Sequence, residues 1–203
     1  MVLYPDPEES GSNLEASHER EFHTTHSTDM ARLQSDLDAI IPRRDRVAIF
    51  IDGSNLLHAA SHLNIEINYS RLLPSLARDR QILRAYFYTG VDSSNEKQQG
   101  FLLWMQRNGY HVVAKDLQSL PDGSRRASLE VEIAVDMITL ASYCENLVLV
   151  SGNGNLTYVL GQLAYRGANV EVISLRLMTS ESLISAADSY IDLASLREEI
   201  RKL

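Results

Sequence analysis

The sequence predicts an α/β fold, with a doubly wound, mainly parallel five-stranded sheet and helices on both of its faces. From residue 46 onward, short runs of β-branched and leucine residues alternate with segments of helical periodicity. This alternation is typical of a parallel sheet that is buried on both sides. A chain of 203 residues is long enough for one such domain with an appendage, whereas two domains would be cramped.

Each element of this fold is predicted from its own pattern. Apolar runs predict five strands, at residues 47–51, 82–88, 110–114, 147–150 and 170–173. Helical periodicity predicts helices near residues 72–77, 96–108, 129–143 and 156–166. Gly109 and Gly167 follow two of these helices and are expected to cap them. The segment 183–203 is expected to close the domain with a short strand or turn at 190–193 and a charged terminal helix.

The first 42 residues differ from the rest in composition. Residues 1–27 are acidic and poor in large apolar side chains, so we expect a disordered tail. Residues 28–42 carry a helical apolar stripe that ends before Pro42, which predicts a short amphipathic helix or linker. The folded domain is therefore expected to span residues 43–203.

The distribution of charge leaves the partner open. The formal net charge is -8, but the first 42 residues hold nine acidic residues against two arginines. The remaining chain is close to neutral and can combine an acidic pocket with a basic rim, so nucleic acid is not excluded. The single cysteine, Cys144, together with the absence of a signal-peptide pattern or a bilayer-length apolar run, predicts a cytoplasmic protein without membrane contact.

The first candidate site residue is Asp52, which ends the first predicted strand and runs into Gly53-Ser54-Asn55. A carboxylate at the end of a buried strand is costly to desolvate unless a cation or hydrogen-bond donors satisfy it. Ligands of doubly wound sheets bind at this edge. The alternative is structural, with Asp52 or Asn55 capping the helix that follows.

A second acidic group lies in the predicted helix that follows Ser128, which we expect to be its N-cap. Glu132 and Asp136 are four residues apart and share a face, while Glu130 is turned away from Asp136. Glu130 is nearest the strand ends, and Asp136 lies about 9 Å further along the helix axis. For Glu132 an exposed, solvated face of the helix is an equally good explanation.

The loop after the fourth strand reads Ser151-Gly152-Asn153-Gly154-Asn155. A glycine pair after a strand can indicate dinucleotide binding, but the third glycine of that motif would fall at Thr157. The chain also has no Gly-Lys-Ser/Thr phosphate loop. The loop is therefore predicted to shape a site at the sheet edge rather than to bind a dinucleotide.

Several blocks, taken together, resemble a known family. "VAIFIDGSNLL", "RAYFYTG", "KQQGFLLWMQRNGYHVVAKDL", "LEVEIAVDMITLA" and "VLVSGNGNLTYVL" are similar to successive blocks of the NYN domain, of the PIN-like nuclease superfamily, in its LabA-like family of cyanobacteria. The resemblance covers roughly residues 46–192. It implies a strand order of 3-2-1-4-5 and an acidic cluster that binds Mg²⁺ or Mn²⁺ for RNA cleavage. By this resemblance the metal ligands are Asp52, Glu130 and Asn153, and the catalytic residues are these three with Asp136.

The sequence departs from the family in the loop after the fourth strand. Asn153 and Asn155 stand where the family usually has aspartates, so the loop keeps its size and loses two negative charges. An asparagine carbonyl holds a hard dication less firmly than a carboxylate does, and a neutral amide cannot act as a base. The activity is expected to be weak or lost. The alternative function is a catalytically inactive, RNA- or protein-binding regulatory domain, and the resemblance implies a role in circadian output or gene expression.

The residues expected to bind substrate flank this site: Asn55, Lys115, Arg125, Arg126 and Ser151. Basic groups at a groove suit single-stranded RNA, although the two arginines could simply solvate a turn. Trp104 has helical spacing in "FLLWM" and is expected to fill the core rather than stack on bases. A regulatory protein is a further expected partner, and an edge strand or the terminal helix could support a homodimer. A receiver-like domain is a distant alternative, since it needs paired acids near the first strand, where this chain has only Asp52.

Overall fold

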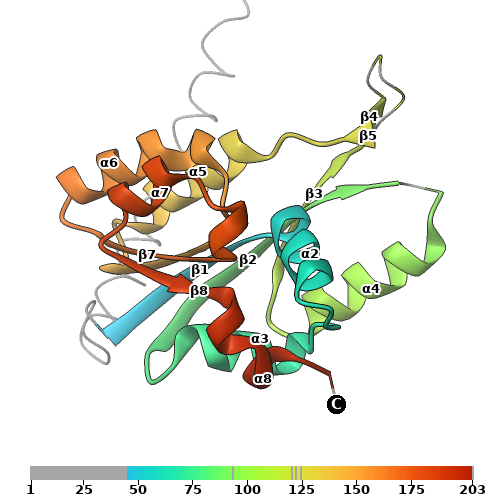
Figure 1. Ribbon diagram of the computed structural model, residues 1–203, viewed down its shortest axis with the longest axis horizontal. Helices are drawn as coiled ribbons and strands as arrows, with labels where there is room; N and C mark the ends of the chain where they lie inside the picture. Colours follow the sequence, from blue (N-terminus) through green and yellow to red (C-terminus); the bar gives the residue numbers. More distant parts are fainter. Residues whose placement is uncertain (1–44, 93, 120, 122, 124, 203) are drawn as a thin grey trace, which may run out of the picture. The chain divides into compact units, whose positions relative to one another are not determined.

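The computed structural model describes residues 45–202 except 93, 120, 122 and 124. The predicted acidic tail (1–27) and the amphipathic segment (28–42) lie outside the described residues. Within the described part, the main sheet has six parallel strands in the order β3-β2-β1-β6-β7-β8 (Figure 1). Their bounds are β1 Arg46–Asp52, β2 Gln81–Val91, β3 His111–Asp116, β6 Asn146–Val150, β7 Asn169–Ser174 and β8 Ser189–Asp192.

The predicted doubly wound sheet is confirmed, and one strand is added to it. The five predicted strands are present in the predicted order 3-2-1-4-5, and β8 pairs beyond them with β7. A strand or a turn was expected at this position, and the structure has a strand. A separate antiparallel pair, β4 (Gln118–Ser119) and β5 (Arg125–Arg126), was not predicted. Each of its strands has only two residues, which is too short for a periodic pattern.

Helices cover both faces of the sheet (Figure 1). In Figure 1, α5, α6 and α7 lie on one face, and α2, α3, α4 and α8 lie on the other. Their bounds are α2 Gly53–His62, α3 Tyr69–Ala77, α4 Glu96–Arg107, α5 Glu130–Leu140, α6 Thr157–Tyr165, α7 Glu181–Ala186 and α8 Arg197–Ile200. Single 3₁₀ turns, η2 (Gly154–Leu156), η3 (Arg176–Met178) and η4 (Leu193–Leu196), join these elements.

The central strand β1 divides the core into two layers. Val47, Ile49 and Ile51 belong to the apolar cluster on the α2 side, while Ala48 and Phe50 belong to the cluster under α5 and α6. Successive side chains of a strand point to opposite faces, so an uninterrupted apolar run is what a strand buried on both faces requires. This burial fixes the end of β1, and with it the position of Asp52.

Truncating Ile49 to valine tests this packing. Ile49 is fully buried, so Ile49→Val removes one methylene group and leaves a small cavity. We expect the free energy of unfolding to fall by about 1 kcal/mol in urea denaturation. The exposed Val131→Ala on α5 is the control and should change it by less than about 0.5 kcal/mol. Equal effects of the two substitutions would contradict the buried position of Ile49.

Two sequence-based expectations about local structure have opposite outcomes. Gly109 and Gly167 end their helices with φ of 90° and 77°, in the region that favours glycine, as their capping role requires. Trp104, expected in the core, is 39% exposed, because α4 buries Leu102 and Met105 on its inner face and turns Trp104 outward. No helix among the described residues combines the length and apolarity needed to cross a bilayer.

Candidate functional site

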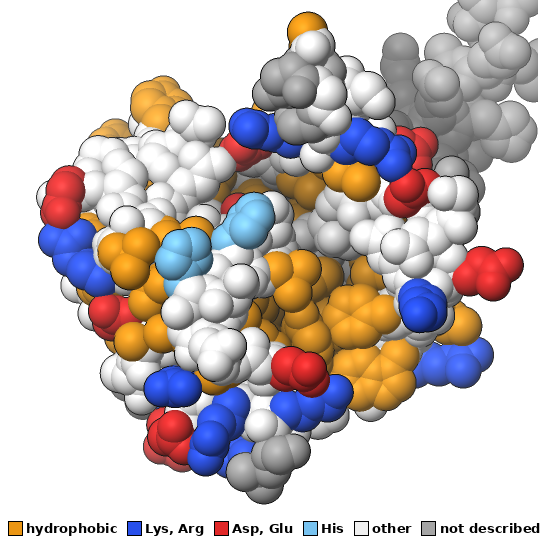
Figure 2. Space-filling model, turned by 45° about the vertical axis from the view of Figure 1, so that its right-hand side comes forward, with side chains coloured by type: hydrophobic (Ala, Val, Ile, Leu, Met, Phe, Trp, Pro, Cys, Tyr) orange, Lys and Arg blue, Asp and Glu red, His pale blue; other side chains and the backbone are white. Residues whose placement is uncertain are grey.

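A pocket of about 770 Å³ opens at the carboxyl end of β1 and β2. Residues from α2, β5, α5 and the loop after β6 line it. In Figure 2 it is hollowed between histidine side chains on one side and Lys and Arg side chains on the other, with acidic and hydrophobic side chains within. This is the sheet edge where doubly wound folds bind ligands.

Asp52 lies at the floor of this pocket and also caps α2. Its Oδ1 accepts a hydrogen bond from the main-chain N–H of Asn55 (3.1 Å), and its Oδ2 accepts one from the Ser151 hydroxyl (3.0 Å). Burial raises the pKa of Asp52, these hydrogen bonds lower it, and the charge of Glu130 raises it further, so that the net shift is upward. The structural interpretation of Asp52 as a helix cap is confirmed, and the same residue also lines the pocket, so its role as a site residue stays a prediction.

Asn55 ties the pocket floor to the loop after β6. Its Oδ1 accepts hydrogen bonds from the main-chain N–H of Gly152 (3.1 Å) and from the Ser174 hydroxyl (3.2 Å). A Cβ atom on Gly152 would lie 2.4 Å from the carbonyl oxygen of Met178, so only glycine fits here. Ser151 is fully buried, and its hydroxyl also accepts a hydrogen bond from the N–H of Asn153. Asn55 and Ser151, both expected to bind substrate, thus act in this structure to hold the loop in place.

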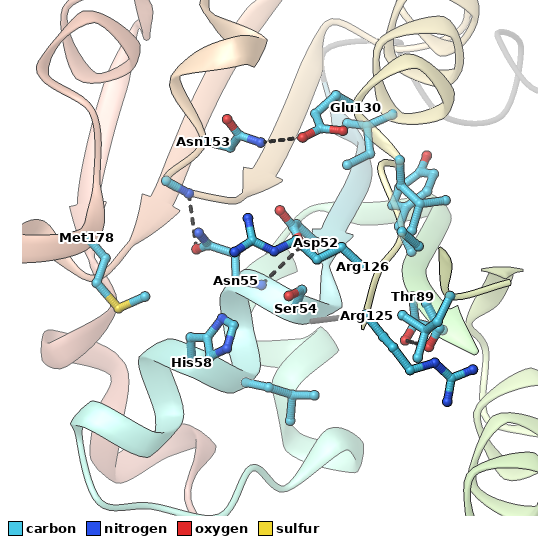
Figure 3. A pocket seen from close by; sticks show the side chains of 18 of the residues that line it. Asp52, Ser54, Asn55, His58, Thr89, Arg125, Arg126, Glu130, Asn153 and Met178 are labelled. Carbon is cyan, nitrogen blue, oxygen red and sulfur yellow. Dashed lines mark hydrogen bonds between the residues drawn. The ribbon is translucent and has the colours of Figure 1, made fainter. Parts of the chain in front are cut away.

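Asn153 faces Glu130 across the pocket with its amide nitrogen (Figure 3). Asn153 Nδ2 donates to Glu130 Oε1 at 2.9 Å, while Asn153 Oδ1 accepts from the N–H of Asn155 at 3.0 Å. With the amide turned over, its oxygen would face the Glu130 carboxylate and its nitrogen would face the N–H of Asn155. These two contacts therefore determine the orientation of the Asn153 amide. Asn153 therefore presents a neutral donor to Glu130, in the place where an aspartate would present a second negative charge.

Glu130 begins α5 and reaches the pocket from a different segment than Asp52. Burial raises its pKa, but hydrogen bonds from Ser128, from its own main chain and from Asn153 outweigh that effect, and the net shift is downward. The expected N-cap role of Ser128 is wrong, because Leu129 occupies the N-cap position. The Ser128 hydroxyl instead donates to Glu130 Oε2.

The other acids of α5 point elsewhere. Asp136 accepts a hydrogen bond from the Tyr88 hydroxyl (2.9 Å) and does not line the pocket. Burial, followed by the Asp136 charge, raises the pKa of Tyr88, so this hydroxyl stays a donor. Glu132 pairs with Lys115 Nζ at 2.7 Å, and Lys115 also lies outside the pocket lining. Asp136, expected to be catalytic, and Lys115, expected to bind substrate, are therefore held by neighbouring side chains away from the floor.

This placement gives a testable consequence for Asp136. Asp136→Asn keeps an oxygen that can accept from Tyr88, so we expect Mn²⁺ affinity and RNA affinity to change by less than about twofold. Calorimetric Mn²⁺ titration and an RNA-binding isotherm measure both. A loss of tenfold or more in either would place Asp136 back among the residues that act at the site.

The two arginines of β5 point in different directions. Arg125 forms an ion pair with Asp92, whose pKa is lowered to about 2 by hydrogen bonds from Ser94 and Arg125. Figure 3 shows Arg126 extending into the pocket toward Asp52, while Arg125 points away. Within the described part of the chain, the Arg126 side chain has no acidic partner. Neighbouring residues of a strand alternate in direction, which accounts for the difference.

Sequence reasoning missed the pocket wall formed by α2. Leu57 and His58 line the pocket from this helix, and Met178 lines it from η3. His58 follows Asn55 by three residues and so lies on the same face of the helix. The three-residue spacing of Asn55 and His58 in the sequence is the signal that could have found this wall.

Asp52 and Glu130 are the two carboxylates of this site that could hold a hydrated divalent cation. No three His, Cys, Asp or Glu side chains gather in a metal-binding group within the described residues. Asp52 and Glu130 both line the pocket, and the charge of Glu130 contributes to raising the pKa of Asp52. Mg²⁺ is commonly held through one or two carboxylates and several waters, so these two residues would suffice for weak binding. Asn153 adds no charge to this set.

The fold and the pocket define a doubly wound α/β domain with a pocket at the carboxyl edge of its sheet that two carboxylates and two arginines line. The chain belongs to the NYN domain family, whose model matches residues 46–194. It is 32% identical over 168 residues to the Low amplitude and bright protein LabA of Synechococcus elongatus, and the match covers 79% of this chain and 90% of that protein. A crystal structure of a protein of unknown function from Vibrio parahaemolyticus has the same fold, with a TM-score of 0.68 and 22% identity, over 80% of this chain and 99% of that one.

Proposed function

We propose that this NYN-domain protein is a slow ribonuclease that acts on single-stranded RNA with one Mg²⁺ or Mn²⁺, and that it serves as a regulator. The observation that carries the proposal is the meeting of two carboxylates, Asp52 and Glu130, from separate segments in one pocket that also receives Arg126. Like charges in a partly buried pocket repel each other, and a bound cation relieves that repulsion. The regulatory role follows from similarity to LabA and from the resemblance to its family, which implies circadian output or gene expression.

The residues present divide the work between them. Arg126 contacts the phosphate oxygens of the RNA and holds the backbone over the pocket floor. Asp52 and Glu130 would hold the cation, and Ser151 and Asn55 fix the loop that shapes the floor. When bound, the cation stabilises negative charge on the phosphate and lowers the pKa of a water molecule. A third carboxylate would bind the cation more tightly. Asn153 supplies a neutral amide at that position, so cleavage is slow.

A second candidate function is RNA binding without cleavage. The specific observation in its favour is the hydrogen bond from Asn153 to Glu130, which satisfies that carboxylate without a cation. In this case the protein binds RNA and recruits another protein to it. The two candidates share the pocket and differ only in whether the phosphodiester bond breaks.

Purified full-length protein, incubated with a labelled single-stranded RNA in Mg²⁺, in Mn²⁺ and in chelator, separates the candidates. Cleavage in metal that Asp52→Asn abolishes supports the ribonuclease, because a contaminating nuclease would persist in the variant. RNA that is bound but stays intact in every metal supports the second candidate. RNA that is neither bound nor cleaved overturns both.

A further inference from the structure

The pocket is larger than its polar floor requires. A hydrated cation and one phosphate group use only part of a volume of about 770 Å³, which is of the size that holds a small organic ligand. Part of the remaining lining is apolar and comes from α5, from Leu57 and Met178, and from Leu117 and Ala127. The pocket can therefore receive a larger and less polar group beside the phosphate.

The apolar side chains of the lining differ in exposure. On the α5 side, Leu129 is 9% and Ile133 is 2% exposed, so these side chains are already covered by the core. Leu117, Ala127 and Met178 are half-buried, whereas Leu57 on α2 is 53% exposed and precedes the exposed His58. The most exposed apolar side chain that a ligand could still bury is thus Leu57, on the α2 side.

The ring of His58 is free to make such a contact. Among the described residues no hydrogen bond, ion pair or ring contact involves its imidazole, and the His62 ring nitrogen contacts the main-chain carbonyl oxygen of His58 rather than its ring. Figure 3 shows the ring at the pocket edge, on the same helix as Asn55 and across the pocket from Glu130. A flat ring on a rigid helix beside a phosphate-binding arginine is the arrangement by which proteins stack unpaired bases.

We propose that Leu57, His58 and Met178 form a subsite for one unpaired nucleobase, which stacks on the His58 ring while Arg126 holds the adjoining phosphate. This inference rests on the proposed action on single-stranded RNA and adds the residue that selects an unpaired base. The base buries apolar surface of Leu57 and Met178, and the backbone is thereby fixed over Asp52 and Glu130. A base held in a duplex cannot reach the subsite, because its faces are already stacked on its neighbours.

Fluorescence anisotropy of the full-length protein in chelator tests the subsite, since no metal-dependent cleavage occurs there. The probes are a labelled single-stranded RNA and an oligonucleotide of the same length with abasic ribose at every position. We expect the wild type to prefer the base-containing RNA, and His58→Ala to weaken its binding about tenfold while leaving the abasic probe unaffected. His58→Phe restores binding, because phenylalanine can stack but cannot exchange protons. His62→Ala is the control, since this exposed histidine lies one turn further along α2 and outside the pocket lining.

The outcomes separate this inference from the proposed function. If the wild type binds RNA and His58→Ala binds it equally well, the subsite is overturned and the proposed RNA binding stands. His58→Phe binding as weakly as His58→Ala also overturns it, because the contact would then be polar rather than stacked. A wild type that binds neither probe in chelator overturns the subsite, and it overturns the proposed function as well only if the RNA is also neither bound nor cleaved in Mg²⁺ or Mn²⁺.

Discussion

Asn153→Asp combined with Asn155→Asp is expected to tighten Mn²⁺ binding by about tenfold or more. In the wild type, the Asn153 amide donates to Glu130, which is a contact that needs no cation. With aspartate at 153, two carboxylates face each other at hydrogen-bond distance and repel unless a cation lies between them. Cation affinity rises with the number of anionic ligands, and about 1.4 kcal/mol from the added charges is a factor of ten.

Isothermal titration calorimetry with Mn²⁺ measures this change, and thermal unfolding gives an independent readout. The double variant should unfold at a lower temperature than the wild type in chelator and gain more stability from Mn²⁺. Asn68→Asp is a matched control, because Asn68 also caps a helix with its side chain but lies outside the pocket lining. Equal Mn²⁺ affinity in wild type and double variant would mean that Glu130 and Asp52 do not face a common cation.

How much of the fold the sequence predicts depends on how strongly each element is buried. The strands of the main sheet could be predicted because short continuous apolar runs such as 147–150 are typical of strands buried on both faces. Helix α2 was expected only as the helix that Asp52 or Asn55 could cap, and its bounds were not predicted. It begins with Gly53-Ser54-Asn55, which are poor helix formers, and depends on the Asp52 cap for its start. Local propensity does not predict an element whose structure depends on a tertiary contact or on a helix cap.

For the candidate site, the sequence predicted which residues lie near one another but not the hydrogen bonds between them. The carboxyl ends of parallel strands meet at one edge, which is enough to bring Asp52 and Asn153 to one pocket. Helical spacing also gave the divergence of Glu130 and Asp136. The direction of the Asn153 amide depends on Glu130 of α5 and on the main-chain N–H of Asn155, and the partner of Asp136 is Tyr88 of β2. No spacing rule along the chain supplies these contacts.

Asp52→Asn is expected to abolish metal-dependent RNA cleavage and at the same time to stabilise the fold at neutral pH. Loss of the charge on the pocket floor should reduce cleavage by about a hundredfold or more, because cation binding and transition-state charge both depend on it. Asparagine keeps an oxygen for the N–H of Asn55 and remains a good helix cap, so the fold should persist.

The gain in stability follows from the sign of the pKa shift. Burial raises the pKa of Asp52 above its ordinary value of 3.8, so the folded protein binds this proton more tightly than the unfolded chain does. The charged carboxylate therefore costs stability, and this cost is absent below pH 3.8 and grows as the pH rises through the folded-state pKa. Urea denaturation from pH 3 to 8 should show the variant overtaking the wild type in free energy of unfolding as the pH increases.

Metal should reverse this order. Mn²⁺ stabilises only the protein that binds it, so saturating Mn²⁺ should narrow or invert the difference between wild type and Asp52→Asn at pH 7. Ser54→Ala is a fitting control, since Ser54 lines the same pocket and is exposed but carries no charge. A variant less stable than wild type at every pH would mean that Asp52 serves the cap alone. A functional site predicts a residue that lowers the stability of the free protein and whose cost a bound ligand removes. The pH series measures that cost for Asp52 directly.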